Sequence, residues 1–405
     1  MTSAPSVARS LAKWAHAFKP THADLALADR ALKDTLAVAL AARNHPLKDI
    51  VTSAELPEAA RWAAMSHVID FDDLHIETTT HISVVTVPAV LAARGDARAY
   101  LAGAGTFARL AAAFGWGHYA AGWHITCTAG APAAAVAAGI SFGLSEDELA
   151  RAISLSIPAA GGVQEAFGTH GKSLQVGMAA AAGVTAARLA RAGATAAPAA
   201  VESWLRKLGG NPESLQVPDT PAVPGGLAIK MFPCCYAMQR PIAAIRELKA
   251  KLGGIDVNKV TKIKATTPAG TVHPLIYDHP TTGLEGKFSI QYSLATALLD
   301  DYSGFESFTD KMVQRPEAKK LMGLVEVVKT DLPINNLLNG DVVIEITMAD
   351  GTTHKTQMAL PPGAPERPPT DAELADKIKS CGDDLPAMLN NITWEQGAKE
   401  MVKAF

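Results

Sequence analysis

The sequence predicts a mainly helical protein, with a large all-helical domain followed by a smaller α+β domain. A chain of 405 residues is long for one hydrophobic core, so at least two domains are expected. From residue 25 to about 213, apolar residues recur every three to four positions, which is typical of helices. Alternating and β-branched patterns begin only after residue 226. The helical and strand signals are therefore separated along the chain.

The first domain, residues 1–225, is expected to be helical throughout. Helical periodicity is clearest in the segments DLALADRALKDTLAVALAAR and GAGTFARLAAAFG. Ser145 followed by Glu148 predicts a capping box at the start of a helix. The uncharged run at 125–144 is long enough to cross a bilayer, but its Thr, Gly, Pro and Ser content favours a buried helix in a soluble protein.

The second domain, residues 226–382, is expected to be α+β and mostly antiparallel. A Pro/Gly/Ser-rich stretch at 211–226 predicts the boundary before it. Strand patterns occupy residues 261–268, 325–330, 341–348 and 352–360. Asp350-Gly351 joins the last two as a hairpin. The amphipathic tail, residues 383–405, is expected to pack back onto the first domain.

Composition excludes several classes of protein. The chain is 48% hydrophobic and 19% charged, with a net charge of −3, so a disordered or nucleic-acid-binding protein is not expected. Arg9 and Lys13 interrupt the stretch where a signal peptide needs an apolar core. The four cysteines form no C-x-x-C pair, which fits a reducing compartment. We therefore expect a cytoplasmic protein that does not bind a membrane.

Two motifs suggest chemistry that their context does not support. GISFG at 139–143 fits the G-x-S-x-G pattern of a serine nucleophile, but no strand precedes it. Residues 70–81, DFDDLHIETTTH, hold three aspartates and two histidines, whose carboxylates and imidazoles are suitable metal ligands. Their spacing does not complete a ligand shell, because no further carboxylate–His pair or H-x-x-x-H pattern accompanies them. No metal is therefore expected.

Several polar residues interrupt apolar segments and together suggest a cationic pocket. Any one of them alone would be typical of a solvent-exposed lysine or a buried, hydrogen-bonded histidine. They are His124, His170, Lys172, Lys230, Lys287 and Tyr292.

The sequence resembles the MmgE/PrpD family, which includes 2-methylcitrate dehydratase, cis-aconitate decarboxylase and iminodisuccinate epimerase. The resemblance covers nearly the whole chain and depends on five segments in the family's order. They are DFDDLHIETTTHISVVTVPAVLAA, GWHITCTAGAPAAAVAAGISFGLSEDEL, FGTHGKSLQVGMAAAAGVTAARLARAG, KMFPCCYAMQRPI and KFSIQYSLATALL. The resemblance implies an all-helical large domain, a smaller α+β lid, a homodimer and no cofactor.

The resemblance also implies a set of site residues. Catalytic positions would be Asp70, His81, His124, Lys172 and Tyr292, and substrate-binding positions would be His75, His170, Lys230 and Gln239. The chain departs from the dehydratases and decarboxylases at three positions. It has Leu74 where they usually have Thr, Ile82 where they often have Pro, and Gln239 where they have a His. These departures leave open which family reaction applies.

The implied chemistry is removal of a proton beside a carboxylate of a small di- or tricarboxylate. Lys172, Lys230 and a protonated His124 would hold the developing negative charge. His81 would be the base, oriented by Asp70, with Tyr292 as proton donor, although exchanged acid and base roles fit equally well. The hypotheses are a hydro-lyase of the 2-methylcitrate type, an epimerase of the iminodisuccinate type and a cis-aconitate-type decarboxylase. A non-catalytic helical binding or dimerisation protein is the alternative from another class.

Overall fold

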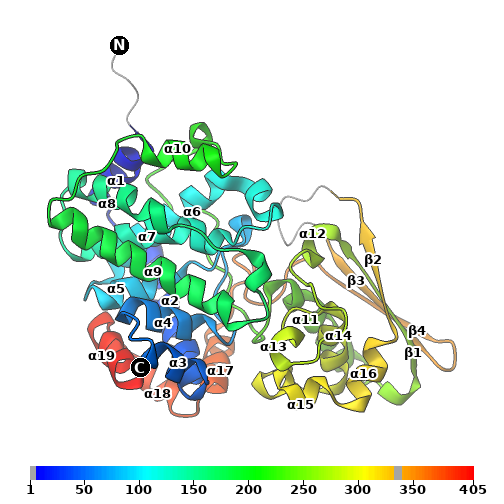
Figure 1. Cartoon of the computed structure of the whole chain (residues 1–405). Helices are drawn as coiled ribbons and strands as arrows, with labels where there is room; N and C mark the ends of the chain where they lie inside the picture. Colours follow the sequence, from blue (N-terminus) through cyan, green and yellow to red (C-terminus); the bar gives the residue numbers. More distant parts are fainter. Residues whose placement is uncertain (1–5, 333–339) are drawn as a thin grey trace. The chain divides into compact units, whose positions relative to one another are not determined.

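The computed structural model describes residues 6–332 and 340–405, and the chain divides into two compact units (Figure 1). The first, called the helical unit, comprises the chain up to Ala166, His170–Leu227 and Ala372–Phe405. The second, called the sheet unit, comprises Phe167–Thr169 and Ala228–Asp371. One change of unit along the chain, between Leu227 and Ala228, lies two residues after the boundary expected at 225/226. Nearly all of the helix at 371–381 belongs to the helical unit, whereas the sequence pattern places it in the second domain.

The helical unit contains α-helices joined by short turns and loops, as predicted. Its helices are α1 Val7–Ala17, α2 His22–Ala41, α3 Leu47–Ser53, α4 Glu58–His67, α5 Ser83–Ala92, α6 Ala97–Ala120, α7 Ile125–Ser141, α8 Glu146–Ser156, α9 His170–Arg191, α10 Ala200–Lys207, α17 Asp371–Cys381, α18 Leu385–Leu389 and α19 Trp394–Ala404. The capping box predicted at Ser145 and Glu148 begins α8. The described part of this unit has isolated β-bridges but no strand.

The buried helix α7 lies between α6 and α9 and explains the many small residues of this unit. A Cβ atom on Gly103 of α6 would lie 2.6 Å from the Ala137 Cβ, and one on Gly183 of α9 would lie 2.4 Å from the Ala134 Cβ. Both distances are too short for real contacts, so only glycine lets the backbones approach this closely. None of the described helices is long and apolar enough to span a membrane.

The serine of the GISFG motif is an ordinary helical residue. Ser141 is the last residue of α7, and its hydroxyl donates a 2.8 Å hydrogen bond to the Ala137 carbonyl one turn earlier. A nucleophile elbow requires a sharp strand-to-helix turn, which is not present here. Ser141 thus lies in the helical context that the sequence predicts for this motif.

The sheet unit contains one four-stranded mixed sheet in the order β2-β1-β3-β4. Its strands are β1 Val260–Pro268, β2 Val325–Thr330, β3 Val342–Met348 and β4 Thr353–Met358. β1 pairs in parallel with β2, whereas the other two pairings are antiparallel. Its helices are α11 Gln239–Leu252, α12 Ala269–Val272, α13 Gly283–Gly286, α14 Ile290–Leu299, α15 Asp310–Val313 and α16 Pro316–Met322, of which α11 packs against β3 and β4. All four predicted strands and the Asp350-Gly351 hairpin are confirmed.

Candidate functional site

The polar stretch 70–81 lies in the loop that joins α4 to α5 in the helical unit. His67 ends α4 and Ser83 begins α5, so the loop is anchored at both ends by helices. Asp70 has φ +57°, in the left-handed region that residues with a Cβ rarely adopt. Such a conformation persists only when surrounding contacts hold it, and it is common at functional sites.

Asp72 is the carboxylate that joins two histidines. Its Oδ1 accepts a 3.0 Å hydrogen bond from His67 Nδ1, and its Oδ2 lies 2.6 Å from His81 Nδ1. The Asp72 and His67 side chains are at most 1% exposed, whereas the His81 side chain is 10% exposed. His81 is therefore the imidazole of this pair that a substrate could reach.

The tautomer of His81 follows from its neighbours. The Asp73 backbone carbonyl lies 3.0 Å from His81 Nδ1 and can only accept a hydrogen bond. Nδ1 must therefore carry the hydrogen, which leaves Nε2 of the neutral ring with a lone pair. The backbone N–H of His81 also donates to Thr126 Oγ1, 3.1 Å away, so both the ring and the main chain are fixed. This arrangement suits a general base.

Lys172, in the first turn of α9, pairs with Asp70. Its Nζ lies 2.6 Å from Asp70 Oδ1, and the two side chains are 7% and 3% exposed. The resemblance predicts that Asp70 orients His81, but its carboxylate pairs with the Lys172 ammonium, and Asp72 Oδ2 lies 2.6 Å from His81 Nδ1. A direct role of Asp70 in orienting His81 stays a prediction.

His124 directly precedes α7 and is held by Gln175 of α9. The Gln175 amide accepts from the Val163 N–H at 3.0 Å and donates to the Val163 carbonyl at 3.2 Å, which fixes its orientation. Its Nε2 therefore donates to His124 Nδ1, 2.7 Å away. The hydrogen of a neutral His124 is then on Nε2, where the ring acts as a hydrogen-bond donor.

His124 is neutral rather than protonated. Burial lowers its pKa well below the usual value, and the nearby Lys172 ammonium lowers it further. Burial also lowers the pKa of His67, although Asp72 opposes this shift. A cationic His124 is therefore not supported, because burial disfavours the charged form and the Lys172 ammonium repels it. Lys172 is the cation of this part of the site.

These residues form one cluster, here called the imidazole cluster: His67, Asp70, Asp72, His81, His124 and Lys172. The His67 ring centroid lies 4.6 Å from that of His81 and 6.2 Å from that of His124. The His81 and His124 centroids are 6.5 Å apart. The helical unit thus brings together four of the five residues expected to be catalytic, from the α4–α5 loop, the start of α7 and the start of α9.

The other two histidines predicted in this unit lie elsewhere. His75 accepts at Nδ1 from Thr78 Oγ1, 2.7 Å away, and donates from Nε2 to the Pro224 carbonyl, 2.6 Å away. Both of its ring nitrogens are used, so it holds the loop and has none left for a substrate. The His170 ring packs edge-on against His45, with centroids 5.6 Å apart.

Three predicted residues belong to the sheet unit, where two have structural roles. Tyr292 is fully buried, and its hydroxyl donates to the Ser307 carbonyl. Burial raises its pKa, so the structure does not support it as a proton donor. The Gln239 amide accepts from the Phe232 N–H at 3.0 Å and donates to the Phe232 carbonyl at 2.9 Å, which holds a backbone loop rather than a substrate. Lys230 is buried, and its binding of substrate stays a prediction.

Two residues of this site, His67 and Gln175, are absent from the sequence prediction. Gln175 follows Lys172 by three positions on α9, so both face the same side of the helix, and this spacing could have identified it. His67 ends α4 just before the polar loop. The sequence pattern suggests Asp72 only as a possible metal ligand. Its position between two imidazoles depends on the path of the loop, which the pattern does not specify.

His67, Asp70 and His81 could each offer one ligand atom to a metal, and these atoms lie within 4.8 Å of one another. Ligand atoms on a tetrahedral zinc are about 3.4 Å apart, given bonds of about 2.1 Å. A metal bound to Asp70 would lie close to the Lys172 ammonium, which is 2.6 Å from Asp70 Oδ1 and would repel a cation. As it stands, the cluster is better suited to bind a substrate carboxylate at Lys172 than to bind a metal.

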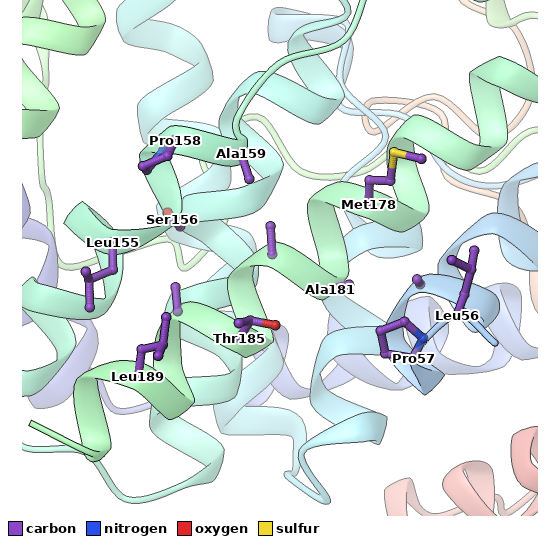
Figure 2. Close-up of a pocket in the computed structure, with 13 residues that line it drawn as sticks. Leu56, Pro57, Leu155, Ser156, Pro158, Ala159, Met178, Ala181, Thr185 and Leu189 are labelled. Carbon is purple, nitrogen blue, oxygen red and sulfur yellow. The ribbon is translucent and has the colours of Figure 1, made fainter. Parts of the chain in front are cut away.

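A separate apolar pocket of about 340 Å³ lies over α9 (Figure 2). Met178, Ala181, Thr185 and Leu189 follow α9 along its floor, with Leu155 and Pro158 on one side and Leu56 and Pro57 on the other. Its lining contains no charged residue, so a polycarboxylate would lose its hydration there without gaining a cation. This pocket is not the candidate active site.

Asp73 provides a test of the site's electrostatics through pH. Burial raises its pKa to about 7, the Asp34 carboxylate adds to the shift, and the hydrogen bond from Ser83 opposes it. Between about pH 4 and pH 7, the folded protein therefore keeps a proton on Asp73. The unfolded chain, in which an Asp has a pKa of about 3.9, has already released that proton. The contribution of Asp73 to the unfolding free energy of the wild type should therefore decrease as pH rises from about 4 to about 7.

Asp73→Asn removes the titration and keeps the size of the side chain. The unfolding free energy of the variant minus that of the wild type should increase as pH rises from about 4 to about 7. Above pH 7 this difference should be constant. Urea unfolding of both proteins at pH 5, 6, 7 and 8 measures it, and titrating groups that are not coupled to Asp73 cancel in the comparison. A difference that does not change with pH would contradict the raised pKa.

Comparison with known proteins gives two family matches and two curated relatives. Residues 50–205 match the MmgE/PrpD N-terminal domain, and residues 232–388 match the MmgE/PrpD C-terminal domain. The chain is 26% identical over 353 residues to a cis-aconitate decarboxylase of Aspergillus terreus, covering 77% of this chain and 71% of the relative. A second cis-aconitate decarboxylase, from Aspergillus terreus strain NIH 2624 / FGSC A1156, matches with the same identity and coverage.

Proposed function

Because the chain belongs to the MmgE/PrpD family, we propose that it is a lyase that removes a proton next to a carboxylate of a small tricarboxylate. The proposed reaction is a dehydration of the 2-methylcitrate type, catalysed by side chains alone. One observation carries the proposal. His81 has a fixed Nδ1–H and a lone pair on Nε2, in the same cluster as the buried Lys172 ammonium.

The reaction begins with His81. Its Nε2 takes the proton from the carbon beside a substrate carboxylate, and the Asp72 carboxylate, 2.6 Å from Nδ1, stabilises the imidazolium that forms. The electron pair left on carbon spreads into the carboxylate, where the Lys172 ammonium and the Nε2–H of neutral His124 hold the charge. The pair then forms the double bond as hydroxide leaves the neighbouring carbon. The His81 proton converts this hydroxide to water and restores the neutral imidazole.

A decarboxylation of cis-aconitate is the second candidate, since both relatives carry that name. There the carbanion arises by loss of carbon dioxide, and an imidazolium must be present at the start to protonate it. The two reactions therefore need His81 in opposite protonation states. Neutral His124 next to His81 is compatible with either.

Proton NMR in deuterated water tests the proposal. The protein is incubated with citrate, 2-methylcitrate, cis-aconitate and iminodisuccinate separately, with heat-inactivated protein as the control. Conversion of the methyl doublet of 2-methylcitrate into a singlet, or a new vinyl CH signal if the CH2 group loses the proton, would support the dehydratase. Release of carbon dioxide from cis-aconitate would identify the decarboxylase instead, and deuterium entering the α position without elimination would identify an epimerase. No change in any substrate would overturn the lyase proposal in favour of a non-catalytic binding protein.

A homodimer and a cytoplasmic location also remain proposals, and they rest on the family resemblance and on the composition of the chain. Sedimentation velocity of the purified protein at micromolar concentration tests the first. Fractionation of the source cells tests the second.

A further inference from the structure

We propose that Lys377 of α17 is a positioning residue for the imidazole cluster, acting through the backbone of Phe71. Its Nζ donates a 2.8 Å hydrogen bond to the Phe71 carbonyl and lies 4.2 Å from the centre of the Phe71 ring. It also pairs with Asp34 of α2 at 2.5 Å, and neither side chain is more than 1% exposed. This inference rests on the proposed function, because it concerns the same catalytic loop.

Phe71 lies between Asp70 and Asp72, the two carboxylates that hold the cation and the base. The orientation of the Phe71 carbonyl therefore constrains the residues on both sides of it. The left-handed conformation of Asp70 is strained and needs contacts that maintain it. Lys172 binds the Asp70 side chain, and Lys377 binds the carbonyl one residue later. Together the two ammonium groups fix the turn that separates Asp70 from Asp72.

A second contact links the same C-terminal segment to the other end of the loop. The ring of Trp394, at the start of α19, lies 5.5 Å from that of Tyr100. The Tyr100 hydroxyl is 2.8 Å from Ser83 Oγ, which donates to the Asp73 carboxylate. Asp73 in turn supplies the carbonyl that fixes His81. The segment after residue 371 thus supports the loop on both sides of Asp72.

A purely structural role for Lys377 makes a different prediction from a positioning role. Removing one member of a buried ion pair leaves an unpaired charge and is strongly destabilising, whereas removing both is often nearly neutral. The variant Lys377→Met should therefore lose stability, and the double variant Asp34→Asn/Lys377→Met should recover most of it. If Lys377 positions the loop, the double variant remains a poor enzyme, because the Phe71 carbonyl still lacks its donor.

The experiment compares the wild type, Lys377→Met, the double variant and Lys379→Met, which changes an exposed lysine of the same helix. Thermal unfolding, kcat and KM are measured with whichever of 2-methylcitrate and cis-aconitate the wild type converts. We expect kcat to fall roughly 10- to 100-fold in the first two variants, as for a misplacement of about 1 Å, with KM within about threefold. Lys379→Met should match the wild type. A double variant with wild-type kcat would overturn the proposal.

A readout that does not need turnover separates this inference from the proposed function. The protein is labelled with ring-¹⁵N histidine, and the His81 signals are assigned by their loss in His81→Asn. The wild type should show Nδ1 protonated and Nε2 unprotonated, and the double variant should show both signals shifted. Unchanged His81 signals would overturn the positioning role even if no substrate is converted. Failure of the wild type on every substrate would count against the proposed function alone.

Discussion

Replacing His81 with asparagine is expected to lower kcat by about 10²–10⁴-fold while leaving the unfolding free energy within about 1 kcal/mol of the wild type. The asparagine amide lies where the imidazole has Nδ1–H, so it can still donate to the Asp73 carbonyl. It has no group at the position of Nε2 that could accept a proton. The substitution therefore separates the structural contact of His81 from its chemistry. Steady-state kinetics and urea unfolding of the same preparation measure both effects.

A matched control is His22→Asn, which makes the same exchange at an exposed position of the helical unit. It should leave kcat, KM and stability unchanged. If His81→Asn retains more than about a tenth of the wild-type kcat, His81 is not the base, because general base catalysis contributes at least about 100-fold.

Replacing Lys172 with methionine is expected to lower kcat/KM by about 10³-fold or more, because it removes the cation that holds the developing charge. It also leaves the Asp70 carboxylate buried at 3% exposure without its ammonium partner. Breaking a buried pair in this way costs about 3–5 kcal/mol of stability. The single variant should therefore lose both activity and thermal stability, as measured by substrate kinetics and calorimetry.

The double variant Asp70→Asn/Lys172→Met distinguishes these two losses. With neither charge present, most of the stability should return, while kcat/KM should stay low. Recovery of activity together with stability would show that Lys172 serves only to neutralise Asp70. That result would remove the cation from the proposed mechanism.

The fold was predictable because its signals are local. The period of apolar residues in α2 and α6, the capping box of α8 and the Asp350-Gly351 turn each depend on a few neighbouring residues. The small residues of α7 were also visible, but their reason, the close approach of α6 and α9, lies in the packing. The grouping of α17 with the helical unit was not predictable, because it follows from contacts such as Lys377 with Asp34, which are 343 positions apart in the chain (377 − 34).

By itself, the sequence determined which chemistry is available: imidazoles, carboxylates and lysines in an apolar chain, with a resemblance that placed Asp70, His81, His124 and Lys172 in one site. Only the tertiary structure decided what each group does. It paired Lys172 with Asp70, set Asp72 beside His81, and used both ring nitrogens of His75 for structure. It also buried His124 near Lys172, which lowers the pKa of the imidazole. The physical reason is that charge state and hydrogen-bond partner depend on burial and on neighbours distant in the chain, which residue type and spacing do not specify.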